Sequence, residues 1–69
     1  MLDVVKIGDK VKKLREKEVI TQEELAQRAG VAVVTLSRIE RNLADPHVST
    51  IRKLARVLNV DPRELVADE

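Results

Sequence analysis

A chain of 69 residues forms one small domain, residues 1–69, which leaves little room for a large enzyme cleft. It has no cysteine, no aromatic residue and one histidine, which excludes disulfides, cysteine-type zinc sites and base stacking on aromatic rings. The net charge is only +1, but basic residues gather near the N-terminus, so a local basic surface remains open to a partner.

Hydrophobic residues make up 43% of the chain, and apart from Met1 they are Leu, Ile, Val and Ala, which favours a core of short packed helices. No apolar run approaches the roughly 18 residues that a membrane span needs, and "MLDVV" is too short for a signal peptide. We therefore expect a cytoplasmic protein without membrane contact, cofactor, metal or small-molecule ligand.

The N-terminal half begins with two predicted helices. Apolar residues at helical spacing, with lysines between them, predict a first helix over residues 5–17. Thr21 and Glu24 have the spacing of a capping box, which predicts the start of a second helix over residues 22–29. A hydrophobic staple is expected just before it, from Val19 or Ile20.

A third helix must follow almost at once, because Gly30 is suited to end the second helix with a positive φ. Leu36 and Ile39 mark the buried side of this helix, predicted over residues 33–41. Asn42 is well suited to a left-handed conformation at its end.

The remaining chain predicts a turn and two more helices. Asp45 precedes Pro46 and is pushed out of helical conformation. A strong apolar pattern predicts a fourth helix over residues 48–59, and Asp61 caps a short fifth helix with Pro62 at its first position. The predicted fold class is all-α with five helices and no strand.

Two short helices joined by a glycine-containing turn are typical of the helix-turn-helix. The stretch "TQEELAQRAGVAVVTLSRIERN", residues 21–42, closely resembles that of the phage-repressor-like family, the Cro and C1-type regulators. The flanks "IGDKVKKLREK" and "PHVSTIRKLARVLNVDPREL" match as well. The resemblance implies a compact lambda-repressor-like DNA-binding domain, with the second and third helices as its helix-turn-helix. The family often has Ser or Thr at the third helix's N-cap, where this chain has Ala32.

The outward face of the third helix carries the candidates for base contacts. With Leu36 and Ile39 inward, helical geometry turns this face outward, and the resemblance implies that it meets the DNA major groove. Its members are Val33, Val34, Ser37 and Arg38. Arg38 can present a bidentate fork to guanine, whereas Val34 offers methyl groups to the thymine methyl. Val33 and Val34 could instead pack in part within the domain or face another protein.

Contacts to the DNA backbone are expected to surround this face. The resemblance implies that Gln22, at the start of the second helix, contacts a phosphate, for which a helix N-terminus is well suited. Weaker candidates, each with a solvated surface role as the alternative, are Thr35, Arg41, Asn42 and Lys10. Residues 43–45 offer no positive charge, which predicts few phosphate contacts and a shallow salt dependence.

Arg15 and Glu40 are charged residues at positions that face inward. The resemblance implies a buried or half-buried ion pair between them, which joins the first helix to the third. Removing one partner would leave the other charge unpaired, at a cost of roughly 3 to 5 kcal/mol.

No residue set indicates an enzyme, and His47 falls in a turn where it could cap the fourth helix. We expect a sequence-specific transcriptional regulator, acting as a repressor on double-stranded DNA. The alternative is a protein-interaction or antitoxin-type module that uses Val33 and Val34. Because family members generally bind palindromic operators as dimers, we expect a homodimer through the C-terminal helix, with Leu65 and Val66 in contact. Leu2 and Val4 are further apolar residues available for self-association.

Overall fold

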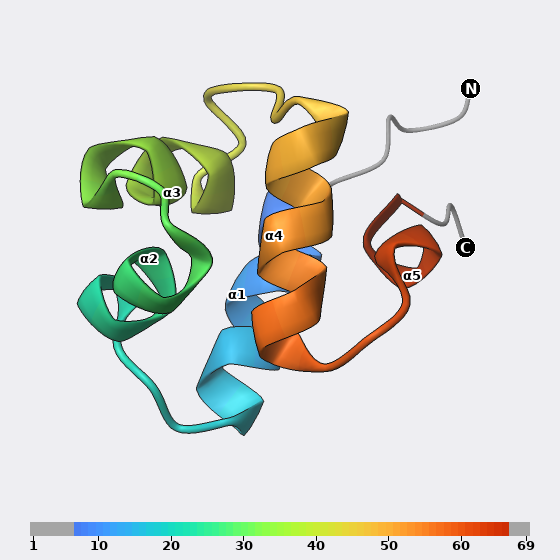
Figure 1. The fold of residues 1–69 in the computed structure, drawn as a ribbon. Helices are drawn as coiled ribbons and strands as arrows, with labels where there is room; N and C mark the ends of the chain where they lie inside the picture. The colour runs from blue at the N-terminus through green and yellow to red at the C-terminus, as the bar shows by residue number, and fades with distance from the viewer. Residues whose placement is uncertain (1–6, 67–69) are drawn as a thin grey trace.

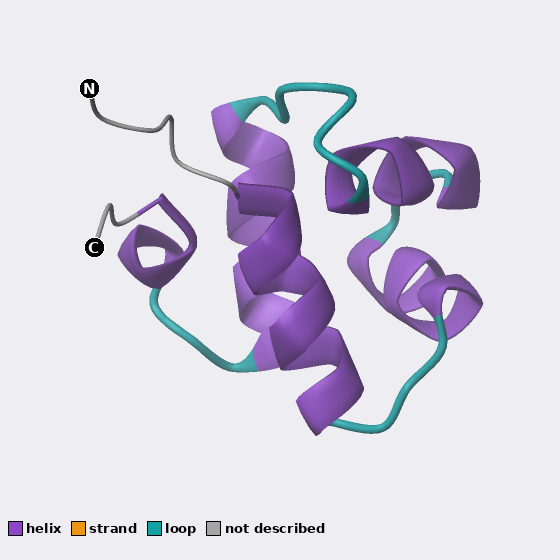
Figure 2. Cartoon of the chain, turned by 180° about the vertical axis from the view of Figure 1, so that it is seen from behind, coloured by secondary structure: helices purple, strands orange, loops and turns teal. Residues whose placement is uncertain are grey.

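The computed structural model describes residues 7–66. In chain order its helices are α1 (Ile7–Lys17), α2 (Gln22–Ala29), α3 (Val33–Glu40), α4 (Val48–Leu58) and α5 (Pro62–Val66) (Figure 1). No strand occurs within this described part of the chain (Figure 2). The predicted all-α, five-helix fold is therefore confirmed, with α3 and α4 each ending one residue earlier than expected. Leu2 and Val4, together with the predicted start of the first helix at residue 5, lie outside the described residues.

The helices pack around a central pair. Helices α1 and α4 lie against each other, with α2 and α3 on one side of them and α5 on the other (Figures 1 and 2). Each helix contributes at least one side chain that is completely buried, and these are Val11, Leu25, Leu36, Leu54, Ala55 and Leu65. Because every helix contributes to one core, the short α2 and α3 are held in place by packing.

The start of α2 follows the predicted chemistry. The Thr21 hydroxyl accepts a hydrogen bond from the Glu24 backbone N–H at 3.0 Å, and the Glu24 carboxylate accepts one from the Thr21 N–H at 2.9 Å. This capping box is confirmed, as is the left-handed Gly30 with φ of 74°. Ile20 packs against the core, whereas Val19 is exposed, so Ile20 is the residue placed to act as the staple.

Three helices besides α2 are followed by a left-handed residue. Asn42 and Asn59 each have φ of 60°, and the prediction for Asn42 is confirmed. Val19, after α1, has φ of 58°, which is unusual because its side chain is β-branched. Its N–H donates to the carbonyl of Glu16, and that of Ile20 donates to the carbonyl of Arg15, which closes the end of α1.

Two expectations need correction. Leu65 is fully buried within the same chain, because α5 packs on α1 and α4, so it cannot serve as a dimer contact. His47 stands at the N-cap position of α4, but its side chain makes no capping hydrogen bond. None of the described helices combines the length and the apolar character needed to cross a membrane.

Candidate nucleic-acid interface

A three-residue turn, residues 30–32, joins α2 to α3 and sets the angle between them. The Val31 N–H donates to the carbonyl of Ala26, and the Gly30 N–H donates to the carbonyl of Gln27. These two bonds close the end of α2 in a Schellman-type motif, which glycine's positive φ makes possible. The half-buried Val31 then packs against the core, so α3 begins within a few residues.

Helix α3 presents one face to the core and another to solvent. Its buried residues are Leu36, Ile39 and Glu40. The predicted base-reading residues lie on the rest of its surface: Val34 is 62% exposed, Val33 is 38% exposed, Arg38 is exposed and Ser37 is half-buried. Thr35 and Arg41, predicted near phosphates, are exposed as well. Two valines and Arg38 therefore stand on an accessible surface of α3, and the exposed Arg41 follows directly after the helix.

An ion pair lies beneath this surface and joins α1 to α3. Arg15 Nε lies 2.7 Å from Glu40 Oε2, and Arg15 Nη2 donates to Glu40 Oε1 at 3.0 Å. The two side chains are 12% and 2% exposed. The hydrogen bonds that Arg15 donates to Glu40 raise the pKa of Arg15, and burial of the guanidinium opposes that rise. The pair implied by the family resemblance is thus present as a two-point contact.

The ion pair belongs to a larger network that sequence reasoning missed. Arg15 Nη1 also donates to the carbonyl of Ile20 at 2.9 Å, and Gln22 Nε2 donates to Glu40 Oε1 at 2.9 Å. The network therefore links α1, α2 and α3. An amide nitrogen carries two hydrogens, so the bond to Glu40 leaves Gln22 one donor for another acceptor. In the sequence, only the inward-facing positions of Arg15 and Glu40 indicated this network. The contact of the Gln22 amide with Glu40 could not be predicted, because it depends on how α2 packs against α3.

A second connection between α1 and α3 lies at Gly8 and Asn42. The Gly8 N–H donates to Asn42 Oδ1 at 3.1 Å, and Asn42 Nδ2 donates to Asp9 Oδ1 at 3.0 Å. A Cβ added at Gly8 would overlap the carbonyl oxygen of Ile39 and lie 2.6 Å from Asn42 Oδ1. The side chain of Asn42 is thus engaged with α1. Lys10, another predicted phosphate residue, is half-buried on α1.

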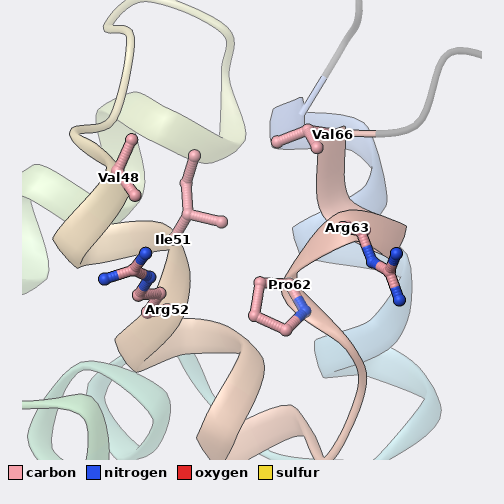
Figure 3. Close-up of a pocket in the computed structure, with 6 residues that line it drawn as sticks. All are labelled: Val48, Ile51, Arg52, Pro62, Arg63 and Val66. Carbon is pink, nitrogen blue, oxygen red and sulfur yellow. The ribbon is translucent and has the colours of Figure 1, made fainter.

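A groove between α4 and α5 lies on the other side of the central helix pair from α3 (Figures 1 and 3). Its lining is mostly apolar, with Val48, Ile51, Pro62 and Val66 beside Arg52 and Arg63. Arg63 forms an ion pair with Asp61, whose hydrogen bonds from Arg63 lower the pKa of that carboxyl. Across the described residues, no cluster of three or more His, Cys, Asp or Glu could hold a metal ion.

Known proteins share both the sequence and the arrangement. The family model described as "Helix-turn-helix" matches residues 11–65. The HTH-type transcriptional regulator SinR of Bacillus subtilis (strain 168) is 38% identical over 64 residues, which cover 91% of this chain and 58% of SinR. The immunity repressor protein of Bacillus phage phi105 is 30% identical, with 91% of this chain and 44% of that protein covered.

Among solved structures, SinR in complex with DNA superposes with a TM-score of 0.85 at 39% identity, covering 88% of this chain and 98% of that one. The chain thus spans 58% and 44% of the two curated relatives, whereas it accounts for nearly all of that solved domain. The chain belongs to the helix-turn-helix family, and the Cro and C1-type resemblance of its sequence is confirmed.

Proposed function

We propose that this chain binds double-stranded DNA in a sequence-specific manner as a transcriptional regulator, acting as a repressor from the cytoplasm. The observation that carries the proposal is the division of α3 into a clamped inner face and an exposed outer face. Glu40 is held by α1 and α2, while Arg38 and Val34 are exposed. Support comes from the DNA complex of SinR, whose domain has the same fold. In this proposal α3 lies in the major groove.

The outer face of α3 supplies the base contacts in this proposal. Arg38 donates to guanine O6 and N7, which discriminates against other bases by roughly 1 to 3 kcal/mol. Val34, with Val33 beside it, covers thymine methyl groups, and the half-buried Ser37 supports the flank of the contact. An operator with guanine and thymine one or two steps apart is the expected target.

Contacts to the phosphates are few in this proposal. Gln22 uses its remaining amide hydrogen, the exposed Thr35 and Arg41 reach phosphates beside the base contacts, and the half-buried Lys10 adds a contact from α1. Residues 43–45, between α3 and α4, carry no cation. Because counterion release scales with the number of neutralised phosphates, the affinity should fall less steeply with salt than in a strongly basic relative.

The test is the variant Arg38→Ala. Duplexes are first selected from a random pool with the wild-type protein, and affinity is then measured by fluorescence anisotropy. Loss of one bidentate base contact should weaken binding to the selected duplex by about 10-fold to 100-fold, with the melting temperature unchanged. Arg56→Ala, an exposed arginine on α4, is the matched control and should bind like the wild type. Equal affinity of the two variants would contradict the proposal.

A second candidate function is a protein-interaction or antitoxin-type module. The observation in its favour is that Val33 and Val34 place adjacent apolar side chains in solvent. A salt titration separates the two functions, because binding through phosphates weakens with added salt and an apolar protein contact does not. Selection of no duplex by the wild-type protein would favour this second function.

The proposed regulator acts as a homodimer on a palindromic operator. The groove between α4 and α5 supports this proposal, because Val48 is 62% exposed and Val66 is 40% exposed on its borders. With Leu65 buried, Val66 is the residue of the C-terminal helix that remains for the contact. A two-fold dimer would place the two α3 helices about one DNA turn apart, roughly 34 to 36 Å.

A further inference from the structure

We propose that Asn42 is a positioning residue for base recognition, which orients α3 by fastening its end to the start of α1. This inference rests on the proposed function and deepens it. It replaces the expectation that the Asn42 side chain contacts a phosphate.

The side chain of Asn42 forms hydrogen bonds with the first turn of α1. Its Oδ1 accepts from the Gly8 N–H at 3.1 Å, and its Nδ2 donates to Asp9 Oδ1 at 3.0 Å. N–H groups in the first turn of a helix have no partner within that helix, so Oδ1 satisfies one of them. The missing Cβ of Gly8 is what permits this close approach, because a methyl group there would overlap the backbone of α3.

The backbone conformation of Asn42 ends α3. With φ of 60°, its N–H donates to the carbonyl of Ile39 at 3.0 Å, and the next N–H, from Leu43, donates to the carbonyl of Arg38 at 2.9 Å. This is the hydrogen-bond pattern of a Schellman motif. Asn42 therefore ends α3, the helix that carries Arg38, and also accepts a hydrogen bond from the first turn of α1.

The connection at Asn42 is one of two polar attachments between α3 and α1 that are seen among the described residues. The other is the ion pair of Arg15 and Glu40. Gly8 and Arg15 are seven residues apart on α1, which is about two turns or roughly 10 Å. Two separated attachments to α1 restrain α3 from pivoting about either one. The loss of Asn42 leaves polar contacts at Glu40 alone, to Arg15 and Gln22, with two buried apolar side chains on α3, Leu36 and Ile39.

The orientation of α3 matters because base contacts are directional. The fork of Arg38 must meet two acceptors of one guanine at once, which requires alignment within roughly 10–20°. Phosphate contacts, in contrast, carry no sequence information. Losing a positioning residue should therefore weaken binding to the selected sequence more than binding to any other sequence. Losing a phosphate contact should weaken both alike.

The experiment measures the affinities of Asn42→Gly for the selected duplex and for a shuffled duplex of equal length. Glycine keeps the left-handed backbone and removes only the side chain. We expect affinity for the selected duplex to fall about tenfold and affinity for the shuffled duplex to change less than about twofold. Asp9→Ala, which removes the other end of the connection, should shift the ratio in the same direction.

Asn59→Gly is the matched control, because Asn59 ends α4 with the same φ of 60°. It should leave both affinities and their ratio unchanged. Equal losses on both duplexes in Asn42→Gly, or no loss on either, would overturn the inference while the proposed function stands. A wild-type protein that prefers neither duplex would overturn the proposed function instead. Melting curves of all variants confirm that the comparison is made on folded protein.

Discussion

At the scale of single residues, Val19 is the position where local conformation and residue type disagree most. It has a φ of 58° and its side chain is 85% exposed, so no packing compensates for the left-handed backbone. A residue with a Cβ loses roughly 1 to 2 kcal/mol in this conformation, and β-branching adds to the strain. Since Val19 itself disfavours this conformation, the end of α1 depends on the contacts of the residues that follow, beginning with Ile20.

Val19→Gly should stabilise the protein. Glycine adopts positive φ without strain, so the free energy of unfolding should rise by about 1 kcal/mol, which is about 4 to 8 °C in melting temperature for a domain of this size. A thermal melt followed by circular dichroism measures the change. Val19→Ala keeps the Cβ and should give a smaller gain. A midpoint that does not rise in Val19→Gly would show that the conformation costs nothing.

The sequence predicts single residues well where the interaction is local or follows a family pattern. Thr21, Glu24 and Gly30 act through neighbours within four residues, so their roles could be inferred from spacing. The amides of Gln22 and Asn42 bond to residues 18 and 34 positions away, and no spacing rule indicates such partners. The strain at Val19 was equally hidden, because no glycine marks the end of α1.

At the scale of helices, α3 differs from α2 in how it begins. The N-cap of α2 has its capping box, whereas Ala32 at the N-cap of α3 makes no side-chain hydrogen bond. Its φ of −71° and ψ of 141° are nonetheless those of an N-cap residue. The sequence could predict this start, because the turn from Gly30 is short. It could not predict that Leu65 faces the core, since the five residues of α5 are too few to define a face.

Ala32→Ser should strengthen the start of α3. The serine oxygen can accept a hydrogen bond from an N–H of the first turn, which is typically worth about 1 kcal/mol. A rise in the midpoint of thermal unfolding, measured by calorimetry, is the expected result. Ala44→Ser, in the exposed loop outside any helix, is the control and should leave the midpoint unchanged. Equal midpoints for both variants would mean that the first turn of α3 gains nothing from a cap.

At the scale of the whole molecule, two accessible surfaces lie on opposite sides of the α1 and α4 pair. One is the outer face of α3, and the other is the groove between α4 and α5 (Figures 1 and 3). In the proposed dimer, this separation lets the groove pair with a second copy while α3 remains free for the proposed DNA contact. Fold and element order could be predicted from the sequence, but the groove could not, because it depends on how α5 returns to α4.

Val66→Asp should disrupt the proposed dimer. A carboxylate on the border of the apolar groove would have to lose its water on association, which disfavours the contact. Sedimentation equilibrium at micromolar concentration should show a wild-type dimer and a variant shifted toward monomer. Val19→Asp makes the same substitution at an exposed valine remote in sequence from the groove, and it should remain dimeric. A wild-type protein that is monomeric both with and without selected DNA would contradict the proposed dimer.

The attachments that hold α3 and the side chains that α3 presents are different sets of residues on one short helix. Leu36, Ile39 and Glu40 face the molecule, while Val34 and Arg38 are exposed to solvent. Substitutions in the second set therefore leave the core and the ion pair intact. If the chain binds DNA as proposed, a change of target sequence is open to it at little risk to folding, and new operators are reachable by single substitutions on this face.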